Sequence, residues 1–150
     1  GQDVFILEGG SPRPRAGGNG DQSRPDWSET DVVFFSNERG EDKWDIVVSS
    51  GVGEKRMVAG NVRLPLRATP SVTPGDGWIV YGSSDPTKST SIFCTALHGG
   101  QEIAIDTGMV AAGEASMALV NDRWLLAFTA LPSEGSDWRK LHVIDITSWF

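Results

Sequence analysis

The sequence predicts an all-β protein built from a repeated four-stranded unit, the pattern of β-propeller blades. Two features of the 150 residues favour many short strands: apolar runs of strand length, and punctuation by 18 Gly and 8 Pro. A third is a segment that recurs about every 45 residues, a period typical of propeller blades. No apolar stripe of helical period extends beyond a turn or two.

The first half of the unit occurs three times. Pro25, Pro70 and Ala115 occupy equivalent places, 45 residues apart in each case. The copies are "RPDWSETDVVFFSN" (24–37), "TPSVTPGDGWIVYGSS" (69–84) and "EASMALVNDRWLLAFT" (114–129). The same alignment sets Phe35 against Tyr81 and Phe128, with spacings of 46 and 47 residues, and we interpret the drift as loop insertion.

The second half of the unit also repeats. "WDIVVSSGVGEKRMV" aligns with "SIFCTALHGGQEIAI", which sets Gly53 opposite Gly100, and "KLHVIDITSWF" begins a third copy. "DVFILEGGSPRPR" (3–15) corresponds to a second half whose first half is missing. The chain therefore divides, within a single domain, into approximate units 1–20 (partial), 21–65, 66–110 and 111–150.

Each unit is expected to contain strands a, b, c and d. In the first complete unit they are Arg24–Ser28, Val32–Ser36, Trp44–Ser49 and Glu54–Val58. The b strands ("VVFF", "WIVY", "WLLAF") are apolar on both faces, which indicates a sheet covered above and below. The c strands alternate more, and the charged d strand suits an exposed edge. A β-sandwich of about eight to twelve strands is the alternative.

The repeat resembles the blade motif of TolB-like β-propellers. "RPDWSETDVVFFSNERGEDKWDIVV" has the Pro-x-Trp-Ser turn, the apolar strand, Ser-Asn, and an aromatic-Asp-Ile strand, and "DVFILEGGSPRPR" is similar to the segment that precedes it in that family. The second copy departs by having Val72 and Thr73 in place of Trp-Ser, and the third lacks both prolines. The resemblance implies a propeller fold and a periplasmic or secreted location, but it indicates function poorly because such blades serve unrelated activities.

Propellers of that family usually close with six blades, whereas this chain contains about three. An unclosed array would expose an apolar blade face at each end. We therefore expect a homodimer that closes a six-bladed ring by twofold symmetry; the alternative is a fragment of a longer protein. The chain begins with Gly, which suggests that an upstream segment was removed or omitted. One c strand is surplus, either "DVFIL" or "LHVIDI", and the sequence does not decide between them.

Charge and composition exclude several classes of partner. The net charge is −7, which argues against a nucleic-acid partner because phosphate binding needs a clustered positive surface. No apolar run approaches 18 residues, so no membrane span is predicted, and no signal peptide is visible. Cys94 is the only cysteine and lies in an apolar run, where we expect a buried, unreactive thiol.

The sequence offers no catalytic or metal-binding set and no cofactor motif. His98 and His142 fall in different repeat contexts and are interpreted as ordinary residues. "AGGNG" (16–20) is glycine-rich, but no helix follows it to present amides to a phosphate, so we interpret it as a d–a connection.

The b–c and d–a loops of a propeller gather on one face, where binding normally occurs. We therefore predict a non-enzymatic binding module that recognises a protein segment or a glycan there. An arginine can bind a carboxylate and a tryptophan can stack on a sugar or a side chain. The candidate ligand-binding residues are Arg24, Arg39, Arg67, Asp85, Trp138 and Arg139.

Two other interpretations stay open. A carbohydrate-active lyase or hydrolase of propeller fold would need carboxylates from several blades to converge, and Asp26, Asp85 and Asp137 are the candidates. A structural fragment of a peptidase's gating propeller would have no site of its own.

Overall fold

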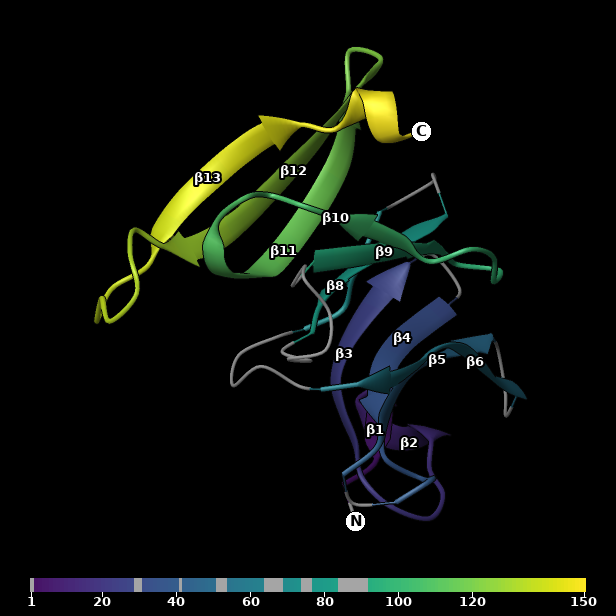
Figure 1. The fold of residues 1–150 in the computed structure, drawn as a ribbon. Coiled ribbons are helices and arrows are strands. Elements are labelled where there is room, and N and C mark those ends of the chain that lie inside the picture. The colour runs from purple at the N-terminus through teal and green to yellow at the C-terminus, as the bar shows by residue number, and fades with distance from the viewer. Residues whose placement is uncertain are drawn as a thin grey trace.

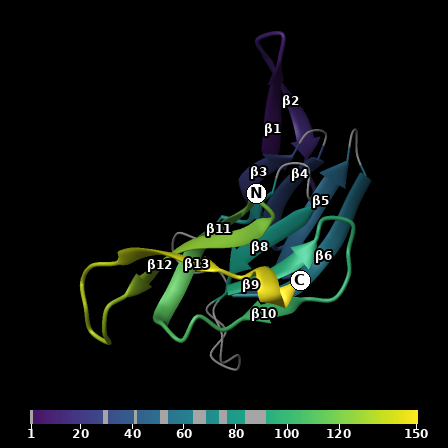
Figure 2. The same ribbon diagram turned by 90° about the horizontal axis from the view of Figure 1, so that it is seen from above.

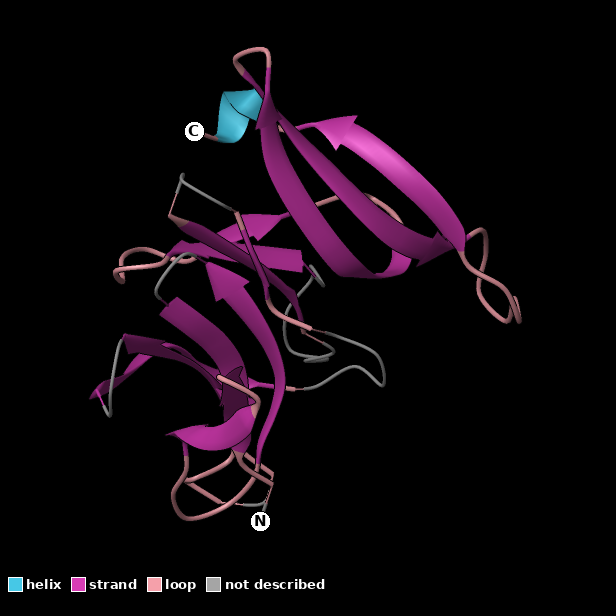
Figure 3. Ribbon diagram, turned by 180° about the vertical axis from the view of Figure 1, so that it is seen from behind, coloured by secondary structure: helices cyan, strands magenta, loops and turns pink. Residues whose placement is uncertain are grey.

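The protein is all-β, as the sequence predicts. The computed structural model describes residues 2–28, 31–40, 42–50, 54–63, 69–73, 77–83 and 92–150. Within these ranges the chain forms antiparallel sheets, and its only helical element is a single 3-10 turn, η1 (Thr147–Trp149), near the C-terminus (Figure 3). No helix in the described part of the chain is long and apolar enough to cross a bilayer.

Each sheet is a meander of strands that follow one another in the chain. The first sheet is the hairpin β1 (Val4–Glu8) and β2 (Ser11–Ala16). The second contains β3 (Gln22–Ser28), β4 (Asp31–Ser36), β5 (Trp44–Ser50) and β6 (Glu54–Val62). The third contains β7 (Ser71–Val72), β8 (Trp78–Gly82), β9 (Ile92–Ala96) and β10 (Ile103–Ile105). The fourth contains β11 (Val110–Val120), β12 (Arg123–Leu131) and β13 (Lys140–Asp145).

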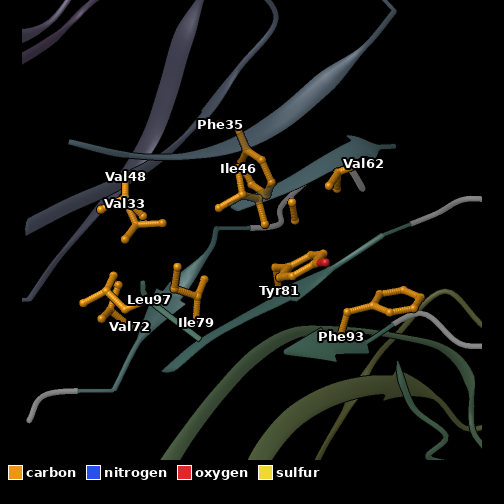
Figure 4. Close-up of a cluster of buried hydrophobic side chains, with 11 residues drawn as sticks. Val33, Phe35, Ile46, Val48, Val62, Val72, Ile79, Tyr81, Phe93 and Leu97 are labelled. Atoms are coloured by element: carbon orange, nitrogen blue, oxygen red, sulfur yellow. The ribbon is translucent and has the colours of Figure 1, made fainter. Parts of the chain in front are cut away.

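The four sheets stack face to face in chain order, from the first sheet near the N-terminus to the fourth near the C-terminus (Figure 1). A separate apolar cluster fills each gap between neighbouring sheets. In the middle gap, Phe35 and Ile46 of the second sheet point toward Ile79 and Tyr81 of the third (Figure 4). Each inner sheet is therefore covered on both faces, which is why its central strands are apolar throughout.

Strand β4 shows this two-sided burial most clearly. Val33 and Phe35 pack against the third sheet, whereas Val32 and Phe34 pack against the first, as the alternation of side chains along a strand requires. The prediction of b strands buried on both faces is confirmed for β4 and β8. It is wrong for β12, where only alternate residues are buried because no described sheet covers its second face.

The prediction for the d strand agrees with the structure, whereas the prediction for the c strands needs a correction. Strand β6 is an exposed, charged edge, as expected for d. The c strands β5 and β9 do not alternate more than the b strands, however, and are buried over most of their length. They lie between the same two neighbouring sheets as the b strands, so both of their faces are covered.

The alignment of the aromatic b-strand residues is also wrong, by one position at Tyr81 and by three positions at Phe128. Phe35 faces the following sheet, whereas Tyr81 and Phe128 face the preceding one. The residues that lie on the same face of their strand as Phe35 are Val80 and Leu125, at successive intervals of 45 residues, so the period set by Pro25 continues through β4, β8 and β12. A shift of a single residue reverses the face of every side chain in a strand.

The same error affects the second half of the unit. The expected pairing sets Ile46 against Phe93, yet Ile46 faces the following sheet and Phe93 the preceding one. Strand pairing joins Phe35 to Ile46 and Val80 to Cys94, so Cys94 is the true counterpart of Ile46.

The two ends of the stack differ. The β1–β2 hairpin projects from the body of the molecule with Phe5 exposed (Figure 2). At the other end, Leu141 and Val143 on the outward face of the fourth sheet are 67% and 60% exposed. The final residue, Phe150, packs its ring against Trp78 and Trp124, with centroid distances of 4.7 and 5.2 Å, and so joins the third sheet to the fourth.

Candidate functional site

A groove lies at one end of the fourth sheet, where a d–a connection meets a b–c loop. The d–a connection runs from β10 to β11, and the b–c loop from β12 to β13. The groove holds about 350 Å³, within the range of small-ligand sites. Its lining residues are Gly108, Met109, Val110, Leu131, Pro132, Lys140 and His142.

Local hydrogen bonds fix the d–a wall of the groove. The Asp106 carboxylate accepts the N–H of Gly108 at 2.9 Å, and the Thr107 hydroxyl accepts the N–H of Met109 at 3.3 Å. Gly108 has a φ of +64°, a conformation that glycine adopts without strain. These bonds hold the turn so that Met109 and Val110 stay exposed along the groove.

The opposite wall carries the positive charge of the groove. Lys140 pairs with Ala130 across the sheet and His142 pairs with Phe128, so both side chains lie on the face that turns toward the third sheet. The His142 ring stacks on Phe128 with a centroid distance of 5.4 Å. None of the seven lining residues carries a carboxylate, although the whole chain has a net charge of −7.

Arg139 lies in the expected b–c loop, but its guanidinium supports the fold. Nε donates to the Thr129 hydroxyl at 2.7 Å, while a terminal nitrogen donates to the carbonyls of Thr129 at 2.9 Å and Ala111 at 2.5 Å. Oε2 of Glu114 lies 3.6 Å from Nε of Arg139. Ala111 and Glu114 both have positive φ where β11 bulges, so Arg139 ties the loop to this irregular strand beside the groove.

Arg39, in the b–c loop of the second sheet, is engaged in a similar way. Its guanidinium forms two hydrogen bonds with the carboxylate of Asp45, one of them at 2.5 Å from Nε. Asp45 is buried and also accepts the N–H of Asn61 at 3.2 Å. These hydrogen bonds and the negative charge of Asp45 raise the pKa of Arg39. The pair anchors the loop to the bulge in β6.

The structure describes two of the four remaining predicted ligand residues. Arg24 lies within β3 at a positive φ, and Trp138 is 60% exposed in the b–c loop between β12 and β13. Arg67 and Asp85 fall outside the described residues.

The carboxylates considered for an enzyme are only partly described. Asp26 accepts the N–H of Val72 at 2.7 Å and that of Trp27 at 2.9 Å, so it joins β3 to β7. Asp137 is exposed in the b–c loop of the fourth sheet, and Asp85 falls outside the described residues. Within the described ranges, no group of three or more His, Cys, Asp or Glu side chains is placed to hold a metal ion.

Cys94 is buried, as predicted. Burial, together with the nearby charge of Glu102, raises the pKa of its thiol to about 12. The neighbouring Tyr81 donates its hydroxyl to Glu102, and burial is the main cause that raises the pKa of the phenol. Both groups stay protonated at neutral pH and have the character of core residues.

Sequence reasoning found the loops but missed the groove itself. Lys140 is not among the predicted ligand residues, and His142 is predicted to be an ordinary residue. The available signal was two basic side chains in alternate positions directly after a b–c loop, which must share one face of a strand. The contribution of Met109 and Val110 had no comparable signal because it depends on the fold of the d–a connection.

Comparison with known proteins places the chain in no group: no family model matches it, and no curated protein does.

Proposed function

We propose that the protein is a non-enzymatic binding module with TolB-like β-propeller blades, which recognises a protein segment or a glycan on its loop face. The observation that carries the proposal is the groove in the fourth sheet, where apolar side chains and two basic ones converge between a d–a connection and a b–c loop. Trp138, exposed in the same b–c loop, offers a further surface for stacking.

Arg39 and Arg139 support the proposed binding role indirectly, because they stabilise the loops that would carry a binding site. Arg39 and Arg139 hold two b–c loops against bulged strands, so these loops are rigid supports for groups carried nearby. Asp26 is likewise committed to backbone amides. These commitments favour binding over general acid–base chemistry.

Display of random peptides and a glycan array, each probed with the purified chain, would test the binding role. We expect at least one ligand to bind the unsubstituted chain. The Met109→Asp variant should bind less of it, because the substitution places a charge on an exposed wall of the groove. Met57→Asp is the matched control, because Met57 is an exposed methionine on the edge strand β6. A failure to bind any peptide or glycan, or a ligand equally sensitive to both substitutions, would contradict the proposal.

We further propose that two chains associate into one closed ring. The support is the apolar surface at each end of the stack, notably Phe5 at one end and Leu141 and Val143 at the other. Light scattering should give twice the chain mass of 16.1 kDa. The Val143→Glu variant should instead give the mass of one chain. A stable monomer of the unsubstituted chain would overturn the association.

A further inference from the structure

The groove combines an apolar wall with basic groups in a defined order. Met109, Val110, Leu131 and Pro132 supply the apolar side. Lys140 and His142 are alternate residues of β13, so their Cα atoms are separated by about 7 Å along the strand. A ligand that fills this groove must therefore present an anionic group close to an apolar one.

The two amides of the d–a turn do not face that anion. The amides of Gly108 and Met109 are already donated to Asp106 and Thr107. The Lys140 ammonium, in contrast, forms no ion pair with any described residue. An imidazole nitrogen of His142 can add a second donor. Side chains, not a nest of amides, are thus the groups that attract a negative charge.

We infer that the groove binds the C-terminal residue of a polypeptide that ends in an apolar amino acid. Its α-carboxylate pairs with Lys140, and its side chain packs against Met109 and Leu131. A C-terminal residue carries the carboxylate and the apolar side chain on one Cα atom, which matches the adjacency of the two walls. An internal Asp or Glu would instead bring its own charged side chain against the apolar wall. The inference rests on the proposed binding of a protein segment at the loop face.

The test uses two N-acetylated Gly-Ser-Gly-Leu peptides, one with a free C-terminal acid and one with a C-terminal amide. Binding is followed in the ¹⁵N-labelled full chain by the shifts of the amides of residues 108–110 and 140–142. Lys140→Met removes the charge and keeps much of the length of the side chain. Lys43→Met is the matched control, because Lys43 is an exposed lysine beside a different b–c loop. Acetyl-leucine and inorganic phosphate serve as further probes.

We expect the free acid to shift these amides and to bind about tenfold more tightly than the amide, the effect of one charge-assisted hydrogen bond. Lys140→Met should remove this preference and Lys43→Met should leave it. Equal binding of acid and amide would overturn the inference, and so would a preference that survives Lys140→Met. Acetyl-leucine carries the same α-carboxylate and side chain on one Cα atom, so its binding should show the same dependence on Lys140. Equal or tighter binding of phosphate would also overturn the inference, because recognition would not then need the apolar side chain.

The inference and the proposed function fail in different ways. If the peptide pair does not bind but a displayed peptide or a glycan does, and Met109→Asp weakens that ligand, the binding module stands and the C-terminal ligand is rejected. If neither the peptide pair nor any displayed ligand binds, both are rejected.

Discussion

The stacked arrangement makes a sharp prediction about two adjacent phenylalanines of β4. Phe34 packs toward the first sheet and Phe35 toward the third, and both are fully buried. In a sheet with one solvated face, two neighbouring residues could not both be buried, because side chains alternate between faces. Shortening either residue should therefore destabilise the protein to a similar degree.

The size of the effect follows from the atoms removed. Phe→Leu deletes about three carbons, and at about 0.8 kcal/mol for each buried carbon the free energy of unfolding should fall by about 2 kcal/mol at either position. Phe→Ala would cost about 3 to 5 kcal/mol, a large part of the stability of an ordinary domain, so the milder substitution is preferable. Leu141→Ala, at a side chain that is 67% exposed, should cost at most about 0.5 kcal/mol.

Urea unfolding followed by tryptophan fluorescence would measure all three variants, with the slope against urea compared to check that the transition remains two-state. If Phe34→Leu costs no more than Leu141→Ala while Phe35→Leu costs about 2 kcal/mol, the β1–β2 hairpin does not cover this face of the second sheet. The stack would then begin at the second sheet, and the claim that the second sheet is covered on both faces would be refuted.

Three further predictions concern single groups. Gly20→Ala should lower the free energy of unfolding by more than about 1 kcal/mol in urea titrations, because Gly20 has a φ of +87° and an added Cβ would lie 2.5 Å from Oδ1 of Asn37; an unchanged midpoint would contradict this. Hydrogen bonds from Thr147 lower the pKa of Asp145 from 3.8 to about 2, so its stabilisation is complete above about pH 4 and is lost as the pH falls through about 2. Asp145→Asn should flatten that part of the Tm profile, and an identical profile would reject the assignment. Cys94 should react with a disulfide reagent only as the protein unfolds, whereas rapid labelling of the native chain would show that its thiol is accessible.

The strand pattern of this protein could be predicted from the sequence because the residues within each strand and turn determine it. The b strands β4 and β8 are apolar throughout, and a strand buried on both faces has no polar positions. Turn residues such as Asn121 and Asp122, both at positive φ, then delimit the hairpins.

What sequence could not supply was the face on which each side chain lies. Phe35 and Tyr81 are both aromatic residues of b strands, and chemical similarity placed them at equivalent positions. They pack on opposite sides of the repeat and meet in the same apolar cluster. Register depends on hydrogen-bond pairing between strands, and a run of apolar residues fits either register equally well.

The candidate site was hard to predict for a related reason. The loops were identified, but Arg139, which was expected to bind a ligand, donates instead to the carbonyl of Ala111, 28 residues away in the sequence. Ala111 lies where the register of β11 shifts, and a bulge leaves no clear mark in a single sequence.

The corrected register also bears on how the stack can be extended. Phe35 pairs with Ile46 in the second sheet and Val80 with Cys94 in the third, and both pairs are buried against the next sheet. The equivalent pair in the fourth sheet is Leu125 with Asp145.

The carboxylate of Asp145 is bound by the exposed guanidinium of Arg123, with 2.8 Å between Nε and Oδ2. A sheet that docked squarely on this face would have to remove that ion pair from water, and the desolvation of both charges would oppose it. The other half of the face exposes Leu141 and Val143, but Thr129, which pairs with Leu141, is bound there by Arg139, whose Nε lies 3.6 Å from Oε2 of Glu114. Association through the fourth sheet would therefore be opposed by the desolvation of charged groups at both ends of this face, and the apolar area of Leu141 and Val143 is the part of the face that can favour it.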